Sequence, residues 1–509
     1  METKTAAIEM RNITKRFGPV LANDKVWLNI YRGEILALLG ENGSGKTTLM
    51  NMLSGIYFPD EGEIKIDGKA VVIRSPKDAF DNGIGMIHQH FKLVDVLTAA
   101  ENIVLGLPGK LDLKAASAKI REICDKYGFS VDPTQKIYDM SVSQKQTVEI
   151  VKVLYRGADI LILDEPTAVL TPQETDKLFA VLRNMRNDGK AIVIITHKMH
   201  EVEALSDRVA ILRHGQFIGD MLTKDTNAQE MTNMMVGHAV SLNIERPDPV
   251  DPKPRIEVKG LTVRSVDGII KLDDVSFTAN SGEILGIAGI SGCGQKELLE
   301  AIAGLQTVES GSISYIEDDG SREELVGKDP LSIAELGVSL SFVPEDRLGM
   351  GLVGNMNLAD NMMLRSFRRG KSIFTDRRSP RALAEAVVQE LSVSTPSVDT
   401  PVRRLSGGNV QKVLVGREIA SAPTVLLTAY AVRGLDIHSS YTIYDLINRQ
   451  KKAGVAVIFV GEDLDVLLEL CDRILVLCGG KVSGIVPGRG AEKREVGMMM
   501  TKLGGQSHE

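Results

Sequence analysis

The sequence lacks the features that mark several classes of protein. Its four cysteines stand at scattered positions without the spacing of metal ligands, a pattern typical of a reducing cytosol. No apolar run reaches the roughly 18–20 residues that a membrane span needs. The N-terminal stretch METKTAAIEM has no apolar core, so we expect no signal peptide. The net charge of −7 gives no general attraction to nucleic acid or anionic lipid. From the cysteine pattern and the lack of a membrane span, we expect that any function at a membrane takes place at its cytoplasmic face, through partners.

What the sequence does have is the composition of an ordinary globular protein. Hydrophobic residues make up 43% of the chain and charged residues 25%, which is enough apolar material to bury a sizeable core. A length of 509 residues predicts roughly two to four domains.

Segments in the two halves of the chain match one another. YRGEILALLGENGSGKTTLM (31–50) aligns with NSGEILGIAGISGCGQKELL (280–299), and ALSDRVAILRHGQ and MSVSQKQ have counterparts in ELCDRILVLCGGK and LSGGNVQ. A repeat of this length indicates duplication of a whole domain. Between the halves, ERPDPVDPKPR is dense in proline, which favours an extended, semi-rigid linker. We predict a first domain at 1–244, a linker at 245–255 and a second domain at 256–509.

Each half alternates apolar, β-rich runs such as ILALL and AIVIIT with helical stretches. This alternation predicts an α/β domain with a mainly parallel sheet. Residues from about 95 to 140 have a helical pattern and few strand signals, so we expect a helical subdomain inserted into the sheet domain.

The first half contains a glycine-rich loop between a predicted strand and a predicted helix. GENGSGKT fits the pattern of a phosphate-binding P-loop in the context that its mechanism requires. Glycines let backbone N–H groups close around phosphate oxygens, and the following helix N-terminus adds positive potential. We expect Lys46 to reach the β- and γ-phosphates and the Thr47 hydroxyl to bind Mg²⁺. The predicted nucleotide-binding residues of the loop are Gly40, Glu41, Asn42, Gly43, Ser44, Gly45, Lys46, Thr47 and Thr48.

Further candidates lie beside apolar strands of the same half. ILILDEPT places Asp164 and Glu165 at a strand end, where we expect Asp164 to bind Mg²⁺ and Glu165 to act as general base on the attacking water. His197 follows AIVIIT, and taken alone it fits a structural histidine as well as a site residue. Gln89 follows GIGMIH, and taken alone it also fits a polar loop residue. Phe17 either stacks on adenine or packs in the core.

Taken in order, these residues resemble the ATP-binding cassette (ABC) family over nearly the whole chain. That family has an adenine-stacking aromatic, a P-loop, a Q-loop, a signature, an acidic strand end and a switch histidine. The matching positions here are Phe17, Gly40–Thr48, Gln89, Ser141–Gln146, Asp164–Glu165 and His197. The resemblance implies ATP and Mg²⁺ as ligands, with Gln89 contacting the metal and water and facing a permease, and His197 contacting the γ-phosphate. It implies the fold class α/β, with two tandem P-loop NTPase (ABC ATPase) domains that each have a mainly parallel sheet core and an inserted helical subdomain.

The second half carries a close match to the family signature, LSGGNVQ. Ser406, Gly407 and Gly408 would offer a hydroxyl and bare backbone amides to a γ-phosphate, and a Cβ would block so close an approach. In the ABC family the signature of one half covers the nucleotide held by the P-loop of the other. We therefore expect the first P-loop and the second signature to form one competent ATP site.

The opposite site has lost residues on both of its sides. Gln295 and Lys296 replace the P-loop lysine and threonine, and the turn of about 100° per helical residue keeps Lys296 from standing in for the lysine. Ala429 and Tyr430 stand where aspartate and glutamate belong, so we expect no efficient hydrolysis there. The remaining departures are Glu345 and Glu462 at the Q-loop and histidine positions, Val142 and Ser143 in the first signature, and Thr171 in place of an aspartate.

Fused cassettes with a degenerate second half and the string VPEDR resemble the ATPases of bacterial importers for simple sugars and nucleosides. GIGMIHQHFKLV and DEPTAVLTPQE are most similar to the nucleoside branch, which is linked to a basic membrane lipoprotein. This implies two integral-membrane permease subunits, an extracytoplasmic substrate-binding lipoprotein and a peripheral position at the cytoplasmic face of the cell membrane.

Two alternatives to the nucleoside importer stay open. One is the ATPase of a simple-sugar importer of the ribose or galactose type. The more remote one is a soluble tandem ABC protein that acts on ribosomes or DNA. That class usually has two complete ATP sites, a long charged linker or a zinc module, so the sequence gives no reason to expect a nucleic-acid partner.

Overall fold

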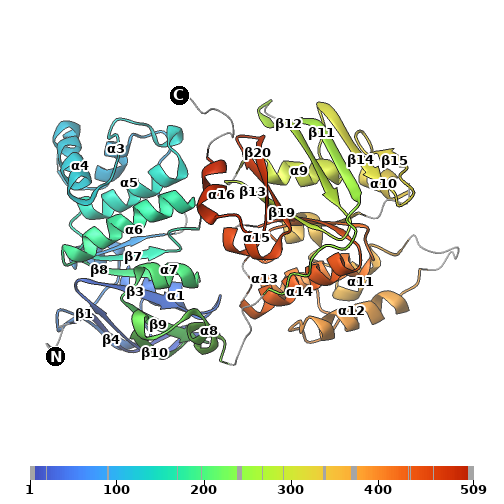
Figure 1. Cartoon of the computed structure of the whole chain (residues 1–509). Coiled ribbons are helices and arrows are strands. Elements are labelled where there is room, and N and C mark those ends of the chain that lie inside the picture. Colours follow the sequence, from blue (N-terminus) through green and yellow to red (C-terminus); the bar gives the residue numbers. More distant parts are fainter. Residues whose placement is uncertain are drawn as a thin grey trace. The chain divides into compact units, whose positions relative to one another are not determined.

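The computed structural model describes the chain except for residues 1–5, 19, 89–90, 110, 169, 197, 238–243, 266–267, 291, 336–339, 345, 368–374, 434, 436, 462 and 502–509. The chain divides into two compact units, Met1–Ser241 and Leu242–Glu509. Both units are built from sheets and helices of the α/β class, as the sequence predicts (Figure 1).

The centre of the first unit is a six-stranded sheet in the order β10-β9-β3-β8-β7-β6. All neighbouring strands are parallel except β9 and β10, which pair antiparallel. Strands such as ILALL are buried along their whole length, as expected for a parallel sheet covered on both faces. The strands of this sheet are β3 (Glu34–Leu39), β6 (Ile84–Ile87), β7 (Ile160–Asp164), β8 (Ala191–Ile195), β9 (Arg208–Arg213) and β10 (Gln216–Leu222).

A second, antiparallel sheet of the first unit has the order β2-β1-β4-β5. Its buried side chains join those of the central sheet and of helix α1 in one hydrophobic core. The P-loop directly precedes α1, whose buried side chains belong to this core, so the core anchors the loop. The strands are β1 (Ala6–Phe17), β2 (Val20–Tyr31), β4 (Glu61–Ile66) and β5 (Lys69–Val71).

Helices α3, α4 and α5 pack together at one end of the first unit and have a hydrophobic cluster of their own (Figure 1). This is the helical subdomain predicted from residues 95–140, extended by the helix that follows the first signature. The helices of the unit are α1 (Lys46–Leu53), α2 (Pro76–Asp81), α3 (Ala99–Val104), α4 (Leu113–Tyr127), α5 (Val142–Tyr155), α6 (Pro172–Asn187), α7 (Met199–Leu205) and α8 (Ala228–Val236).

The second unit repeats both sheet topologies, which confirms the predicted duplication. Its sheets have the orders β20-β19-β13-β18-β17-β16 and β12-β11-β14-β15. The strands are β11 (Pro254–Arg264), β12 (Ile270–Asn280), β13 (Ile284–Ala288), β14 (Ser310–Ile316), β15 (Arg322–Glu324), β16 (Leu340–Val343), β17 (Val425–Ala429), β18 (Ala456–Val460), β19 (Arg473–Cys478) and β20 (Lys481–Pro487).

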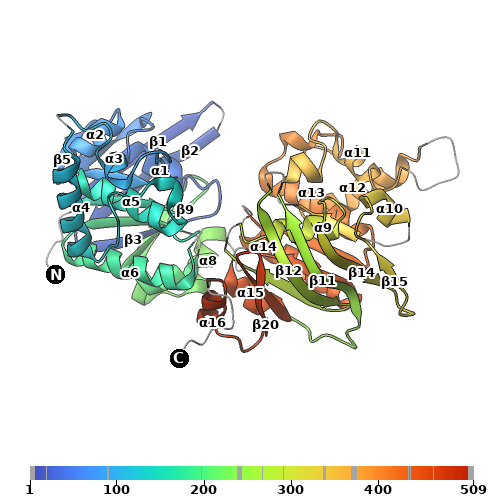
Figure 2. The same cartoon turned by 90° about the horizontal axis from the view of Figure 1, so that it is seen from above.

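The second unit also has a helical subdomain, in which α12 packs against both α11 and α13 (Figure 2). A short π-helix, Arg347–Gly351, follows β16 and has no counterpart among the elements of the first unit. The helices are α9 (Gln295–Ile302), α10 (Pro330–Glu335), α11 (Leu358–Met363), α12 (Arg378–Glu390), α13 (Gly407–Ala420), α14 (Ile437–Lys452), α15 (Leu464–Leu470) and α16 (Lys493–Met499).

The proline-rich segment predicted as a linker lies against the second unit. The guanidinium of Arg246 is buried and donates hydrogen bonds to the backbone carbonyls of Leu468 and Cys471. Lys451 donates to the carbonyl of Pro247. The last two residues of the predicted linker, 254 and 255, already belong to β11. The segment is therefore fastened to the second unit by its own backbone and side chains.

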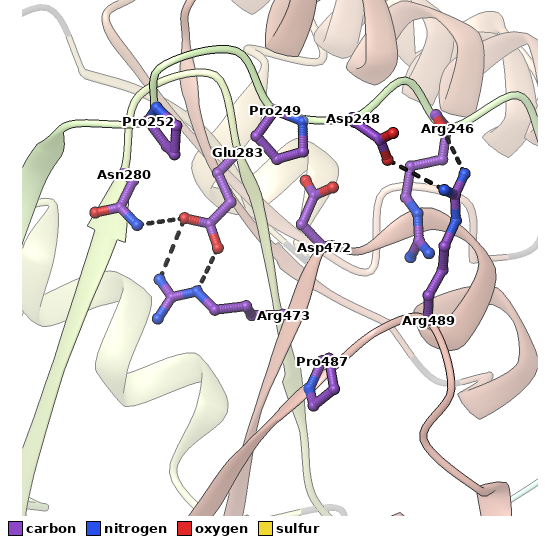
Figure 3. A pocket seen from close by; sticks show the side chains of 10 residues that line it. All are labelled: Arg246, Asp248, Pro249, Pro252, Asn280, Glu283, Asp472, Arg473, Pro487 and Arg489. Atoms are coloured by element: carbon purple, nitrogen blue, oxygen red, sulfur yellow. Dashed lines mark hydrogen bonds and ion pairs between the residues drawn. The ribbon is translucent and has the colours of Figure 1, made fainter.

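A cleft of ≈ 400 Å³ lies under this segment (Figure 3). Four of its charged side chains pair with one another: Arg473 binds Glu283, and Arg489 donates to Asp248 at 3.1 Å. The first unit has a pair equivalent to Arg473–Glu283, so that pair is part of the repeated fold. The lining residues are Arg246, Asp248, Pro249, Pro252, Asn280, Glu283, Asp472, Arg473, Pro487 and Arg489, and none of them belongs to a predicted site.

In the described part of the chain, no helix combines the length and the apolar character that crossing a membrane would require.

Candidate functional site

The P-loop of the first unit connects β3 to α1 through backbone that only glycine adopts easily. Gly45, directly before α1, has a φ of 94°, and a Cβ there would lie 2.3 Å from the carbonyl oxygen of Ala22. A Cβ at Gly40 would lie 2.3 Å from the carbonyl oxygen of Leu212. Side chains at either position would force the loop open. These two glycines therefore determine the shape of the loop. The first N–H groups of α1 have no partner within the helix, and at the end of the loop they are suited to bind an anion.

Lys46 closes the loop from inside. Its ammonium donates to the carbonyls of Gly40 at 2.7 Å and Glu41 at 3.0 Å. Burial lowers the pKa of Lys46, and the nearby carboxylates of Glu165, Asp164 and Glu41 oppose this shift. A buried ammonium held by backbone carbonyls of a glycine-rich loop is suited to bind the oxygens of a polyphosphate.

Ser44 supplies a second indication that the loop is built to hold a polar ligand. Among the described residues, none donates to or accepts from its buried hydroxyl. A buried hydroxyl without a partner costs free energy, so it is usually satisfied by water or by a ligand. A phosphate oxygen in the loop would satisfy it.

Asp164 and Thr47 meet at the carboxyl end of β7. The Thr47 hydroxyl donates to a carboxylate oxygen of Asp164 at 3.3 Å. Burial raises the pKa of Asp164, the charge of Glu165 raises it further, and the Thr47 hydrogen bond and Lys46 lower it. A bound divalent cation would reverse this shift by stabilising the carboxylate. One hydroxyl and one carboxylate oxygen beside the P-loop fit the coordination that Mg²⁺ prefers.

Glu165 has an unusual backbone conformation. Its φ is 50°, in the left-handed region that residues other than glycine rarely adopt. Its N–H donates to the carbonyl of Ile195, the last residue of β8, at 2.9 Å. Tyr430, at the matching place in the second unit, has a similar φ of 53°, so this turn belongs to the repeated fold and Glu165 is selected by its motif alone.

Phe17 ends β1 with its ring 40% exposed, so of the two interpretations the structure favours a surface aromatic over a core residue. The ring of Tyr57 meets it edge to face, with centroids 5.1 Å apart, and the Lys15 ammonium lies 5.5 Å from its centroid. An exposed ring beside a cation provides a stacking surface for a purine base. Tyr57 was missed by sequence reasoning, because nothing in its neighbourhood distinguishes it from an ordinary surface tyrosine.

Gln89 and His197 lie outside the described residues, as do Glu345 and Glu462 in the second half. Their assignments rest on the motifs alone.

The two signature serines have the same local structure. Ser406 is the N-cap of α13 and Ser141 the N-cap of α5, and each accepts a hydrogen bond from the backbone N–H three residues later. In the first signature the Ser143 hydroxyl also lies 3.1 Å from that of Ser141. Ser406 is instead followed by Gly407 and Gly408, so the α13 N-terminus carries no side chain at its first two residues.

The second loop reproduces the shape of the first without its charge. Gln295 is buried and its amide donates to the carbonyl of Ile290 at 3.3 Å, as Lys46 does to Glu41. Lys296 points along the helix surface, where its ammonium lies 3.7 Å from Glu300. The next residue along the helix therefore does not replace the missing lysine.

Tyr430 occupies the place of Glu165 in the second unit. Its φ is 53°, and its N–H donates at 2.9 Å to the carbonyl of Val460, the last residue of β18. Ala429 ends β17 as Asp164 ends β7. The two acidic positions are thus lost on a backbone that is otherwise preserved, and the alignment of the halves is correct here.

The chain is similar to known proteins along its whole length. A family model described as ABC transporter matches residues 23–168 and 272–428, one match in each unit. The chain is 42% identical to the nucleoside import ATP-binding protein NupA of Lactococcus lactis subsp. cremoris, over 99% of each chain. It is 40% identical to the glucose import ATP-binding protein TsgD13 of Haloferax volcanii, over 98% of this chain and 96% of that protein. It is also 40% identical to the guanosine import ATP-binding protein NupO of Bacillus subtilis, over 97% of each. With a P-loop in its first unit and a family match in both units, the chain belongs to the ABC transporter family.

Proposed function

We propose that this chain hydrolyses ATP to drive the import of a small solute, and that the solute is a nucleoside. The observation that carries the proposal is the P-loop of the first unit, where Lys46, Thr47 and Asp164 converge in a relative of import ATPases. Two of the three relatives described above are named for nucleoside or guanosine import.

The residues of the first unit divide the work between binding and proton transfer. Lys46 and the loop amides hold the phosphates, and Phe17 stacks on adenine. Thr47, Asp164 and Gln89 would bind Mg²⁺, which when bound neutralises charge on the β- and γ-phosphate oxygens. Glu165 accepts a proton from the water whose oxygen attacks the γ-phosphorus, while the bond to the β-phosphate oxygen breaks and leaves ADP. His197 contacts the γ-phosphate.

The second half contributes its signature and no catalyst of its own. Ser406, Gly407 and Gly408 complete the site that the first P-loop begins. The second loop lacks the lysine, and its strand end lacks both carboxylates, so it does not hydrolyse ATP efficiently. Hydrolysis at the one competent site then removes the phosphate contact that holds the halves together, and this reverses the closure that ATP causes.

The partners follow from the importer assignment. They are two integral-membrane permease subunits and an extracytoplasmic substrate-binding lipoprotein, and the chain works at the cytoplasmic face of the membrane. No nucleic-acid partner is part of the proposal.

A sugar importer is the second candidate, and the glucose import relative favours it. Uptake of labelled nucleosides and of labelled ribose and glucose in the native cells separates the two. We expect Glu165→Gln to abolish nucleoside uptake and leave sugar uptake unchanged. Loss of sugar uptake alone would establish the second candidate, and no change in either would refute the import function.

A further inference from the structure

Glu201 is a buried carboxylate in α7 that accepts hydrogen bonds from two threonines. The Thr167 hydroxyl donates to one of its oxygens, and the Thr196 hydroxyl donates to the other at 3.3 Å. The ammonium of Lys198 lies 3.2 Å from the carboxylate and balances its charge. Glu201, Thr167 and Thr196 are each at most 2% exposed, so the carboxylate and both hydroxyls are buried.

The two threonines stand directly beside the strand ends that carry the proposed chemistry. Thr167 is two residues after Glu165, in the turn that follows β7. Thr196 follows β8 and precedes position 197. The strands are paired up to Asp164 and Ile195, where the ladder stops. Beyond that point the Glu201 carboxylate connects the two chain segments, because it accepts a hydrogen bond from a threonine in each.

The second unit lacks every side chain of this cluster. The matching bonds of Glu165 to Ile195 and of Tyr430 to Val460 set the correspondence of the two halves. It places Val432, Gly461, Asp463 and Val466 where the first unit has Thr167, Thr196, Lys198 and Glu201. The polar cluster is thus present beside the glutamate and absent beside the tyrosine.

Fold stability does not require the cluster at this place. The second unit builds the same strand ends and the same helix, α15, with apolar residues at the threonine and glutamate positions. Buried ionic groups are generally no more stabilising than well-packed apolar residues of similar volume. The cluster is better explained by a need for fixed orientation, because hydrogen bonds specify geometry that apolar contacts leave loose.

We propose that Glu201 is a positioning residue for ATP hydrolysis. It holds the turn that follows Glu165 and the end of β8 at a fixed separation, so that the general base keeps its position in the site. This inference rests on the proposed role of Glu165.

The test compares Glu201→Gln with Glu203→Gln in the full chain. Glu203 is exposed on the same helix and accepts only from the N–H of Ala228 among the hydrogen bonds described, which makes it a matched control. We expect Glu201→Gln to lower kcat between about tenfold and a hundredfold, as small misplacements of catalytic groups do. The KM for ATP, the Kd for ATP measured by fluorescence and the melting temperature should stay close to those of the control.

A double substitution separates positioning from folding. Thr167→Val with Glu201→Val gives these two positions the residues of the second unit, so it should keep the melting temperature near the wild-type value while kcat stays low. A wild-type kcat in Glu201→Gln would overturn the inference, and so would a loss of kcat that merely follows the fraction unfolded. Glu165→Gln is measured in parallel. If it retains turnover, the proposed role of Glu165 has failed; if it is inactive while Glu201→Gln is fully active, only the positioning role has failed.

Discussion

Replacing Lys46 with glutamine gives the first P-loop the residue that the second loop has at the same place. In the second unit Gln295 keeps the loop closed by one hydrogen bond to the carbonyl of Ile290. A glutamine at position 46 is therefore expected to donate to the Glu41 carbonyl and to lose the contact with Gly40. The loop should keep its shape and lose its positive charge.

The structure sets the size of both effects. Losing the hydrogen bond from the charged ammonium to the Gly40 carbonyl costs about 1.5–3 kcal/mol of unfolding free energy. Removing a buried ammonium, whose pKa burial lowers, offsets part of this cost. The melting temperature should therefore fall by only about 2–4 °C for each kcal/mol of the cost that remains. Hydrogen bonds to a charged group contribute about 1.5–3 kcal/mol, so the affinity for ATP should fall about 10- to 150-fold.

The assay titrates a fluorescent ATP analogue, and then competing ATP, into the wild type and the Lys46→Gln variant to measure the Kd for each. The melting temperature of the same samples is measured in parallel. Lys296→Gln is the control, because Lys296 is exposed and contacts only Glu300 among the ion pairs described. The control should bind ATP as the wild type does. Unchanged affinity in Lys46→Gln would refute the phosphate-binding role of Lys46, and a collapse of the melting temperature would refute the equivalence of the two loops.

Two further predictions follow from the same sites. Ser406→Arg should abolish ATP turnover while Ser141→Arg lowers it far less. The hydroxyl of each serine caps a helix, so each variant should lose roughly the 1 kcal/mol of unfolding free energy that such a cap contributes. Equal loss of turnover in both variants would contradict the assignment of the second signature to the active site. Asp164→Asn should leave ATP binding in EDTA unchanged and raise the Mg²⁺ concentration for half-maximal activity at least about tenfold, because it removes a charged ligand beside Thr47. An unchanged Mg²⁺ titration would place the metal elsewhere.

The repeated fold could be predicted because its signals are local. Short sequence patterns predict the apolar strands, the glycine loop and the helical stretch after residue 95. The duplication can also be recognised by comparing the two halves of the sequence. The failure of Lys296 to replace Gln295 also follows from helix geometry alone, and its contact with Glu300 agrees.

Other features depend on contacts that no short pattern reveals. The fastening of Arg246 to the carbonyls of Leu468 and Cys471 joins residues that are distant in sequence, so the proline-rich segment gave no sign of which unit holds it. The Glu201 cluster likewise needs the pairing of β7 with β8 before its members meet. The role of Thr171, by contrast, could be predicted from a short pattern. Thr171 and Glu174 form a capping box at the start of α6, so the threonine that replaces the family's aspartate has a structural role.

The central claim is that one active site serves the whole chain, with its general base in the first unit. The most direct measurement is steady-state ATP hydrolysis by the full chain with Glu165→Gln and, separately, with Tyr430→Gln, its counterpart of equal backbone conformation. We expect Glu165→Gln to lose turnover while still binding ATP, and Tyr430→Gln to change turnover little. A comparable loss in both variants, or full activity in Glu165→Gln, would contradict the claim.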